Sequence, residues 1–312
     1  MRWLKLAAIV SLWLFFFVVL ALVHLYISAL RLPNRWNIVS HCILRFTRSM
    51  RAILNIKITL TGDAAQLESG GDVIISNHLG YLDGIILGSL FPVIFVSKTE
   101  VKSWPLVGLW TTLCGTVFIN RQKKGLILLA VKEIRRKLQQ RANILLFPEG
   151  SATNGERMLP FQTAPLAAPL RSRAMIVPVT LAYQSIEEQP VSIANRDLIY
   201  CYGDMPFGSH FLKLLTLRQV EVRVTIQPKI DCSIYEDNSA GRKRLAEDCY
   251  NIISGPLNKN VLPQADSEAR RQNRVHPVLR GGLPGDISPQ GNHVNQTFSF
   301  SPTPTVEKDF KQ

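Results

Sequence analysis

Apolar and polar positions divide the chain into three regions of different pattern. The first is a continuous apolar run from Leu6 to Leu30 that contains no Asp, Glu, Lys or Arg. At about 1.5 Å per residue, a helix of this length spans a hydrocarbon core of about 30 Å. The run therefore predicts a membrane anchor helix in residues 1–32, followed by a membrane-proximal helix in residues 33–55. A single span and a helical hairpin lying in one leaflet both fit this pattern.

A cleaved signal peptide is the alternative interpretation of the N-terminal run. The apolar part of a signal peptide is usually about 7–15 residues long, and the run here is longer. Arg2 and Lys5 precede it, and Arg31 and Arg35 follow it. Because basic residues flank both ends, counting positive charges leaves the orientation of the helix open. An uncleaved anchor is the interpretation that the length favours.

The second region, residues 56–262, alternates short apolar runs with amphipathic segments. The short runs predict strands at residues 56–60, 73–76, 93–96, 117–119, 144–147, 176–181, 198–202 and 220–226. Apolar stripes at helical spacing predict helices at residues 85–90, 104–113, 126–140 and 242–253. Repeated strand–helix units predict an α/β sheet with helices on its faces. Pro178 interrupts one of the strands, which predicts a sheet edge or a bulge at that position.

The third region, residues 263–312, loses this periodicity. Asn, Gln, Pro, Gly and Ser dominate its composition. Such a segment cannot bury enough apolar surface to offset the entropy of ordering. The pattern predicts a disordered tail.

Charge and cysteine content indicate the cellular compartment of the protein and the class of partner that it binds. The net charge is +13, of which the tail contributes +1 through six basic and five acidic residues, leaving +12 for residues 1–262. This excess suits anionic lipid headgroups, an acidic carrier or nucleic acid, but the chain has no recognised nucleic-acid-binding motif. Its five cysteines include no C-x-x-C pair, which indicates buried thiols in a reducing compartment. The basic, reduced body favours the cytoplasmic side of a membrane.

Candidate chemistry first appears where the strand at residues 73–76 ends. His78 follows that strand, and Asp83 comes five positions later. A histidine accepts a proton near neutral pH, and a carboxylate can fix its tautomer and stabilise the cation. On a regular helix the two positions lie about 140° apart, on different faces. The pair therefore requires His78 on a loop and a helix that begins near Gly80, with Asp83 in its first turn. Taken alone, the spacing is a weak motif.

Two further strand ends carry polar residues of interest. Arg121 follows the strand at residues 117–119, and Glu149 follows the strand at residues 144–147. A guanidinium binds phosphate or carboxylate in a bidentate manner, although Lys123 and Lys124 beside Arg121 also fit a solvated surface. Glu149 would orient Arg121 or accept a hydrogen bond from a substrate hydroxyl, or it would merely cap its turn. Sites in α/β sheets gather where strands end.

Taken in order, these segments resemble the glycerophosphate/lysophospholipid acyltransferase family, of the 1-acylglycerol-3-phosphate acyltransferase type. The resemblance covers residues 30–230 and rests on four ordered blocks: Asn77-His78-x4-Asp83, Gly115-x-x-Phe118-Ile119-Asn120-Arg121, Phe147-Pro148-Glu149-Gly150-Ser151 and Val177-Pro178-Val179. It implies a mixed sheet flanked by helices, like that of a glycerol-3-phosphate acyltransferase, with residues 56–262 as the catalytic domain.

The resemblance also implies a reaction and a place for it. His78 would act as general base on the acceptor hydroxyl, and Asp83 would orient His78. The deprotonated hydroxyl would attack the acyl thioester of acyl-CoA or acyl carrier protein. The acceptor headgroup would be bound by Arg121, Glu149, Gly150, Ser151 and Asn120. No metal or other cofactor is expected. The leading acceptor is 1-acyl-sn-glycerol-3-phosphate, giving phosphatidic acid in phospholipid biosynthesis on the cytoplasmic face of the inner membrane.

Departures from the family pattern keep other acceptors open. Ser151-Ala152-Thr153 stands where the family often has Thr-Arg-Ser, and Gln162 stands where Lys or Arg is usual. Two contacts to a phosphate are thereby lost. These losses and the segment Tyr202-Gly203-Asp204-Met205 favour a lyso-ornithine lipid or another lysophospholipid as the alternative acceptor.

Other classes of protein fit the sequence less well. A serine hydrolase or thioesterase would need a nucleophile elbow, and no G-x-S-x-G motif is present. A non-catalytic membrane lipid-binding protein is the remote alternative. The intact His78, Asp83, Arg121 and Glu149 argue against it.

Overall fold

The computed structural model describes residues 2–258 except 68–69, 105–106 and 121–123. Within them lies one nine-stranded sheet. Its strands are β1 (Ile56–Thr61), β2 (Val73–Ser76), β3 (Val93–Lys98), β4 (Val117–Ile119), β5 (Asn143–Leu146), β6 (Met175–Ile186), β7 (Gln189–Pro190), β8 (Val220–Ile226) and β9 (Ile230–Asp231).

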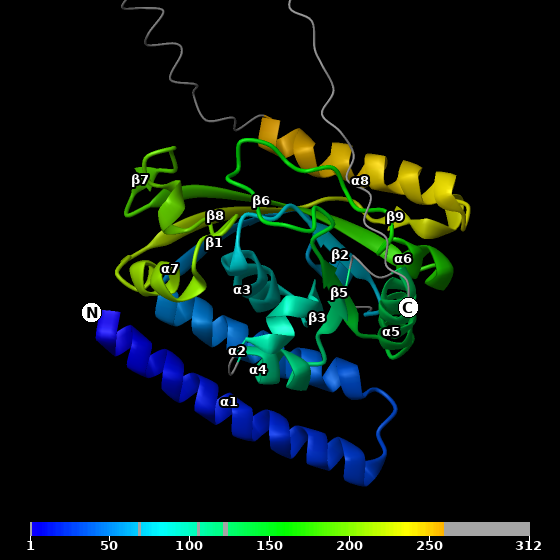
Figure 1. Cartoon of the computed structure of the whole chain (residues 1–312), viewed down its shortest axis with the longest axis horizontal. Coiled ribbons are helices and arrows are strands. Elements are labelled where there is room, and N and C mark those ends of the chain that lie inside the picture. The colour runs from blue at the N-terminus through cyan, green and yellow to red at the C-terminus, as the bar shows by residue number, and fades with distance from the viewer. Residues whose placement is uncertain (1, 68–69, 105–106, 121–123, 259–312) are drawn as a thin grey trace, which may run out of the picture. The chain divides into compact units, whose positions relative to one another are not determined.

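Helices cover both faces of this sheet (Figure 1). The α-helices are α1 (Arg2–Leu30), α2 (Arg35–Leu54), α3 (Tyr81–Leu90), α4 (Val107–Leu113), α5 (Lys124–Gln139), α6 (Ala167–Ser172), α7 (Phe207–Leu214) and α8 (Ser239–Asn258). Short 3-10 turns are η1 (Ala65–Leu67), η2 (Thr99–Ser103), η3 (Arg196–Leu198) and η4 (Cys232–Ile234). α8 packs against β6 on one face, whereas α2 and α3 pack together on the other.

The sheet is mixed, as the family resemblance implies. Its main path runs β1-β8-β6-β2-β5-β3-β4. Strands β6, β2, β5, β3 and β4 are mutually parallel, and β8 runs antiparallel to β6. Because Ile75 of β2 lies opposite Leu146 of β5, the loops that follow these two strands leave the same edge of the sheet. This register brings the blocks around His78 and Glu149 together.

Most predicted strands are observed, but the one at residues 198–202 is not. That segment continues from η3 as irregular chain. Ile199 and Tyr200 are nevertheless buried, because the chain here packs onto the loop after β2, where the Cys201 amide donates a 3.0 Å hydrogen bond to the Leu79 carbonyl. The apolar residues therefore cover the site loop instead of forming a strand. α7, which follows this segment, is a helix that the sequence pattern did not indicate.

Pro178 does not mark a sheet edge, because β6 is an interior strand with neighbours on both sides. The irregularity in its pairing with β8 lies between Tyr183 and Ser185 instead. On the side facing β8 and β9, Pro178 lies opposite the connector between those strands. Pairing with β8 begins at Val179, and pairing with β9 ends at Ile176. A missing amide proton is tolerated at this gap in the ladder.

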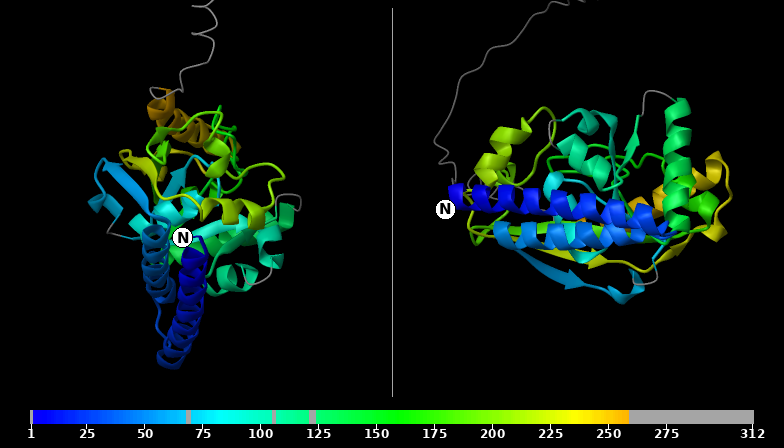
Figure 2. Two further views of the ribbon diagram at one scale, coloured as in Figure 1. Left: turned by 90° about the vertical axis from the view of Figure 1, so that its left-hand side faces the viewer. Right: turned by 90° about the horizontal axis from the view of Figure 1, so that it is seen from below.

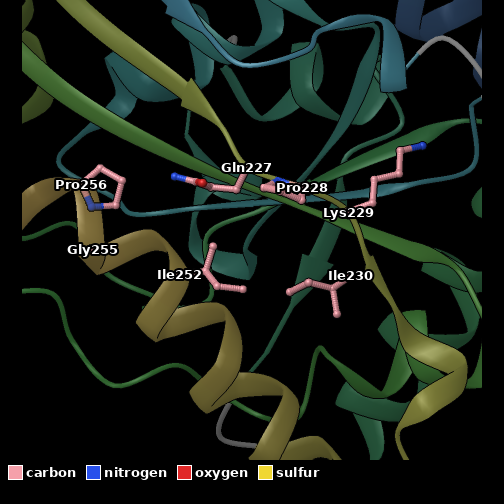
Figure 3. A pocket seen from close by; sticks show the side chains of 7 residues that line it. All are labelled: Gln227, Pro228, Lys229, Ile230, Ile252, Gly255 and Pro256. Atoms are coloured by element: carbon pink, nitrogen blue, oxygen red, sulfur yellow. The ribbon is translucent and has the colours of Figure 1, made fainter.

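The same connector borders a cavity of about 500 Å³ against the C-terminal half of α8 (Figure 3). Among its lining residues, Lys229 carries the charge, and its ammonium forms a 2.7 Å ion pair with Asp72. None of the predicted site residues that the structure describes lines this cavity. It therefore lies outside the catalytic centre.

α1 lies alongside α2, and both run along the same side of the sheet (Figure 2). The side chains of α1 that are buried in this contact are Ile9, Phe16, Leu20 and Ile27, which recur on one helical face. α1 has a mean hydropathy of 2.9 over its most apolar stretch, and within the described ranges it is the helix long and apolar enough to cross a membrane. The bounds of α1 and α2 agree with the helices predicted in residues 1–32 and 33–55, and their role as anchor and membrane-proximal helix stays a prediction. The tail at 263–312 lies outside the described residues.

Candidate active site

The loop between β2 and α3 places His78 against Asp83. Helix α3 begins at Tyr81, so His78 lies on the loop and Asp83 in the first helical turn, as the spacing requires. The His78 Nδ1 and the Asp83 Oδ2 are 2.8 Å apart. A carboxylate only accepts hydrogen bonds, so Nδ1 carries the proton and the neutral ring presents an unprotonated Nε2. The His78 side chain is 22% exposed, which leaves this nitrogen within reach of a substrate.

Asp83 is completely buried, yet its carboxylate is saturated with donors. Oδ2 also accepts hydrogen bonds from the backbone amides of Leu79 at 2.6 Å and Gly80 at 2.9 Å. Oδ1 accepts a 2.8 Å bond from the hydroxyl of Tyr183. A buried charge is tolerated when it is hydrogen-bonded in this way. The imidazole, two loop amides and the Tyr183 hydroxyl therefore hold the carboxylate in one orientation.

A close backbone approach explains the glycine in this turn. A Cβ atom on Gly80 would lie 2.8 Å from the amide nitrogen of Cys201. That amide bonds the Leu79 carbonyl, so the contact cannot widen without breaking it. On the other side, the Thr153 amide donates a 3.0 Å hydrogen bond to the His78 carbonyl. The histidine loop is thus clamped between two distant segments.

Glu149 holds the histidine loop through its backbone. Its Oε1 accepts a 2.7 Å hydrogen bond from the amide of His78, and its Oε2 accepts one of 2.7 Å from the amide of Leu159. The residue is 3% exposed. Burial raises the pKa of the Glu149 carboxyl to about 7, although the two amide bonds oppose that shift. The contact with a substrate headgroup that we expect for Glu149 stays a prediction.

Three other residues of the Phe147 to Ser151 block have defined contacts or backbone geometry. The Phe147 ring stacks on His78 with centroids 4.2 Å apart and planes at 15°. Gly150 has a φ of +79°, which only glycine adopts without strain, and it turns the chain after Glu149. Ser151 is half-buried, and its Oγ accepts a 3.1 Å hydrogen bond from the ammonium of Lys98. Lys98 is a cation beside this block that the sequence motifs did not single out.

The remaining predicted residues, Asn120 and Arg121, follow β4 in the sequence. Asn120 is half-buried directly after that strand, which β3 separates from β5 in the sheet. Arg121 lies outside the described residues. Whether these two bind the headgroup stays a prediction.

Strand β6 contributes two supports that no motif indicated. Besides Tyr183, it provides the backbone of Leu181, whose carbonyl and amide bond both ends of the Asn77 side-chain amide at 3.0 and 2.8 Å. Asn77 immediately precedes His78, so this exchange fixes where the loop leaves β2. Across the described ranges, no group of three or more His, Cys, Asp or Glu side chains is placed to hold a metal ion. The site is an imidazole that is oriented by a buried carboxylate and stacked on an aromatic ring, suited to taking a proton from a hydroxyl.

Comparison with known proteins places this geometry among acyl-transferring enzymes. Residues 57–182 match the family model described as Acyltransferase. The lyso-ornithine lipid O-acyltransferase of Rhodobacter capsulatus is 33% identical, covering 65% of this chain and 70% of that protein. The counterpart of the same name from Rhizobium meliloti is 29% identical over 77% and 79% of the two chains. The 1-acyl-sn-glycerol-3-phosphate acyltransferase of Neisseria meningitidis is 25% identical over 69% and 82%.

A solved structure supports the fold independently. The 1-acyl-sn-glycerophosphate (LPA) acyltransferase of Thermotoga maritima aligns with a TM-score of 0.52 at 15% identity, covering 83% of this chain and 98% of that one. At this identity the likeness concerns the fold. It confirms the predicted α/β architecture with a mixed sheet and flanking helices.

Proposed function

The chain belongs to the acyltransferase family, and from this premise we propose how it moves an acyl group to the hydroxyl of a lysolipid. The observation that carries the proposal is the 2.8 Å contact between His78 Nδ1 and Asp83 Oδ2. It leaves Nε2 as the one ring nitrogen able to accept a proton. The catalytic residues are therefore His78 as general base and Asp83 as the group that orients it and stabilises the imidazolium.

The proposed reaction proceeds in two stages without an acyl-enzyme. Nε2 of His78 takes the proton of the acceptor hydroxyl. At the same time, the hydroxyl oxygen attacks the thioester carbonyl carbon of acyl-CoA or acyl carrier protein. The carbon–sulfur bond of the tetrahedral intermediate then breaks, and the thiolate leaves with the proton held by His78. The products are an ester and a free thiol, and the histidine returns to its neutral form.

We propose 1-acyl-sn-glycerol-3-phosphate as the first candidate for the acceptor. A phosphate headgroup needs a cation, and the family's arginine is replaced by Ala152. The Lys98 ammonium, 3.1 Å from Ser151 Oγ, supplies positive charge at the same block. Asn120 and Arg121 would add to it from the chain after β4, and Gly150 and Ser151 would face the headgroup with Glu149.

A lyso-ornithine lipid is the second candidate acceptor. Two observations favour it: the relatives of that name reach 33% identity, against 25% for the Neisseria meningitidis enzyme, and Ala152 and Gln162 remove basic side chains that a phosphate would use. An ornithine headgroup carries its own amine and needs less cationic compensation.

The packing of α1 supports a place at one leaflet of the membrane. The helix touches the folded body along its whole length: the Lys5 ammonium bonds the Leu217 carbonyl, the Trp13 ring lies 5.0 Å from the Trp110 ring, and His24 bonds the Leu113 carbonyl. A helix that crossed the bilayer would carry these partners into it. We therefore favour the helical hairpin, with the body on the cytoplasmic face of the inner membrane.

The testing experiment compares acceptors and variants in purified membranes. Each acceptor (1-acyl-sn-glycerol-3-phosphate, glycerol-3-phosphate, other lysophospholipids and lyso-ornithine lipid) is offered with labelled acyl-CoA or acyl carrier protein. His78→Ala should abolish transfer, whereas His41→Ala, at an exposed histidine of α2, should not. Residual activity of His78→Ala within a few-fold of the parent would refute the general-base role.

The acceptor assignment has its own variant. Lys98→Met should raise the KM for 1-acyl-sn-glycerol-3-phosphate about tenfold, which corresponds to one charge-assisted hydrogen bond. Its KM for lyso-ornithine lipid should change little, and Lys57→Met, at an exposed lysine of β1, is the matched control. If lyso-ornithine lipid is the acylated acceptor and the phosphate lipid is not, the second candidate replaces the first.

A further inference from the structure

A second cavity lies at the C-terminal end of α1, and its lining comes from the α1–α2 turn and the end of α5. Its volume is about 660 Å³. Of the described residues that are assigned to the acyl transfer, none lines it. The polar side chains in its lining are His24, Ser28, Arg31, Arg35, Arg136 and Gln140.

Within the part of the chain that the structure describes, the three arginines of this cavity have no acidic partner. Among the described residues, no ion pair involves Arg31, Arg35 or Arg136. Arg35 is half-buried, its guanidinium lies 4.6 Å from the centroid of the Trp36 ring, and its Nε is buried without a hydrogen-bond partner. An unpaired buried donor on a cation is costly. A cavity lined by three arginines, one of which carries such a donor, is therefore incomplete without an anion.

The surroundings of the neighbouring Lys137 show the same excess of positive charge. Lys137 is completely buried, with its ammonium 3.2 Å from the centroid of the Trp36 ring and 3.3 Å from the carboxylate of Glu133. Burial, with smaller contributions from the charges of Arg136 and Arg35, lowers the pKa of Lys137 to about 8 against the opposing effect of Glu133. Among the described residues of this corner, one carboxylate, that of Glu133, is set against four cations, those of Arg31, Arg35, Arg136 and Lys137.

The surroundings of the cavity point to an amphiphilic ligand. Ile27 and Leu32 add apolar surface to its lining. Directly beside it, the outward face of α1 exposes Tyr26 at 58% and Leu30 at 54%. A ligand with its anionic group among the arginines would have an apolar helix face along which its hydrocarbon chains could lie. Guanidinium groups are well suited to phosphate.

We propose that this cavity binds the headgroup phosphate of an anionic phospholipid, separately from the acyl-transfer site. Arg31 and Arg136 approach the phosphate from the exposed rim, and Arg35 from within. The bound lipid would stabilise the α1–α2 turn against α5. This site does not depend on which acceptor the enzyme acylates.

The test uses the purified full chain in a neutral detergent and follows thermal unfolding with three probes. These are dioctanoyl phosphatidylglycerol, dioctanoyl phosphatidylcholine and inorganic phosphate. Only the first should raise Tm in a saturable way. Arg31→Gln/Arg136→Gln should weaken its Kd by about tenfold or more, since each lost charge-assisted bond is worth about that factor. Arg45→Gln/Lys132→Gln removes the same charge from exposed positions of α2 and α5 and should leave Kd unchanged.

Each other outcome overturns the proposal in a recognisable way. Equal loss in the control pair would show diffuse attraction, and an equal response to inorganic phosphate would show a site for soluble anions. No saturable response to phosphatidylglycerol would mean no site. Acyl transfer by Arg31→Gln/Arg136→Gln in neutral detergent should match the parent, and its loss would place these arginines in the substrate site instead.

Discussion

The hydroxyl of Tyr183 donates a 2.8 Å hydrogen bond to Oδ1 of Asp83, the carboxylate oxygen that does not face His78. The pair predicted from the sequence is thus part of a chain of three side chains, in which a buried phenol fixes the plane of the carboxylate. Burial and the Asp83 charge hold the pKa of Tyr183 well above its ordinary value, so the phenol remains a donor at every pH at which the enzyme would work. Tyr183 is a positioning residue.

Removing that hydroxyl should slow the reaction without weakening substrate binding. In Tyr183→Phe we expect kcat to fall about three- to tenfold with both KM values unchanged. The expected loss of stability is roughly 1.5–3 kcal/mol, because a hydrogen bond to a charged group is lost. Tyr200→Phe is the matched control, since Tyr200 is also buried and packs on Tyr183 at 5.5 Å. Steady-state kinetics and urea unfolding check both variants, and a change in KM alone would contradict the positioning role.

Neutralising Asp83 should have a far larger effect. In Asp83→Asn the side chain can no longer accept all four donors that it now faces, and the imidazole loses the partner that sets its tautomer. Comparable changes in an acid–base triad cost about 10⁴ in kcat, and we expect a loss of 10³–10⁴-fold. Asp63→Asn, at an exposed residue, should retain full activity. Activity of Asp83→Asn above about one-tenth of the parent would exclude Asp83 from the catalytic pair.

The buried Glu149 should make stability depend on pH. Its pKa is about 7 in the folded chain and 4.5 as the ordinary value. Between these values the unfolded chain binds fewer protons than the folded one, so stability falls as pH rises through this window. The parent should lose up to roughly 3 kcal/mol between pH 5 and 7.5 relative to Glu149→Gln.

Chemical unfolding at several pH values measures this difference. Glu100→Gln, at an exposed position, is the control and should follow the parent at each pH. A stability difference between the parent and Glu149→Gln that is equal at pH 5 and pH 7.5 would show that Glu149 is not the titrating group.

The outward face of α1 should bind membranes. Leu14 is 66% and Leu22 60% exposed, and burying one leucine is worth about 1.5–3 kcal/mol. Leu14→Glu/Leu22→Glu should therefore weaken partition into vesicles by about 100-fold or more with little change in Tm. Ile193→Glu/Ile234→Glu alters residues of 66% and 69% exposure elsewhere and should bind normally. Co-sedimentation of both pairs decides whether this face is the one that meets the lipid.

Arg121 gives a test of headgroup binding. If its guanidinium holds the acceptor, Arg121→Ala should raise the acceptor KM by about tenfold or more and the donor KM much less. Initial rates with each substrate varied in turn separate the two. An equal rise in both constants would remove the headgroup assignment.

Local patterns in the sequence were sufficient for several elements whose contacts are short in range, although they did not indicate α7. The strand at residues 73–76 was predicted with its observed ends, since four buried residues are bounded by polar ones. The spacing of His78 and Asp83 correctly required a helix that starts between them. The predicted strand at 198–202 was wrong, because a short apolar run does not reveal whether it pairs in a sheet or packs on a loop. The burial of Tyr200 comes from packing on a loop.

Contacts between distant segments were beyond local patterns. Tyr183 and Asp83 are 100 positions apart, and nothing near either residue reports the other. The stacking of Phe147 on His78 and the Lys98 bond to Ser151 have the same origin. Each arises from the strand order, which places β2 between β5 and β6 and β3 beside β5. The parallel register of β2 and β5, and not the residue types, brought Glu149 to the backbone of His78.

Strand β6 has a practical meaning for building chimaeric enzymes. The strand supports the catalytic pair through the Leu181 backbone, which bonds Asn77, and the Tyr183 hydroxyl, which bonds Asp83. None of its groups is assigned a contact with a substrate. The segment at residues 147–174 leaves the sheet and returns before this strand begins. We expect an exchange of that segment with a relative's to change the chain around Ser151 together with the contacts that Glu149 and Thr153 make to the His78 backbone. A graft that extends through residues 175–186 would also replace the Leu181 and Tyr183 contacts to Asn77 and Asp83.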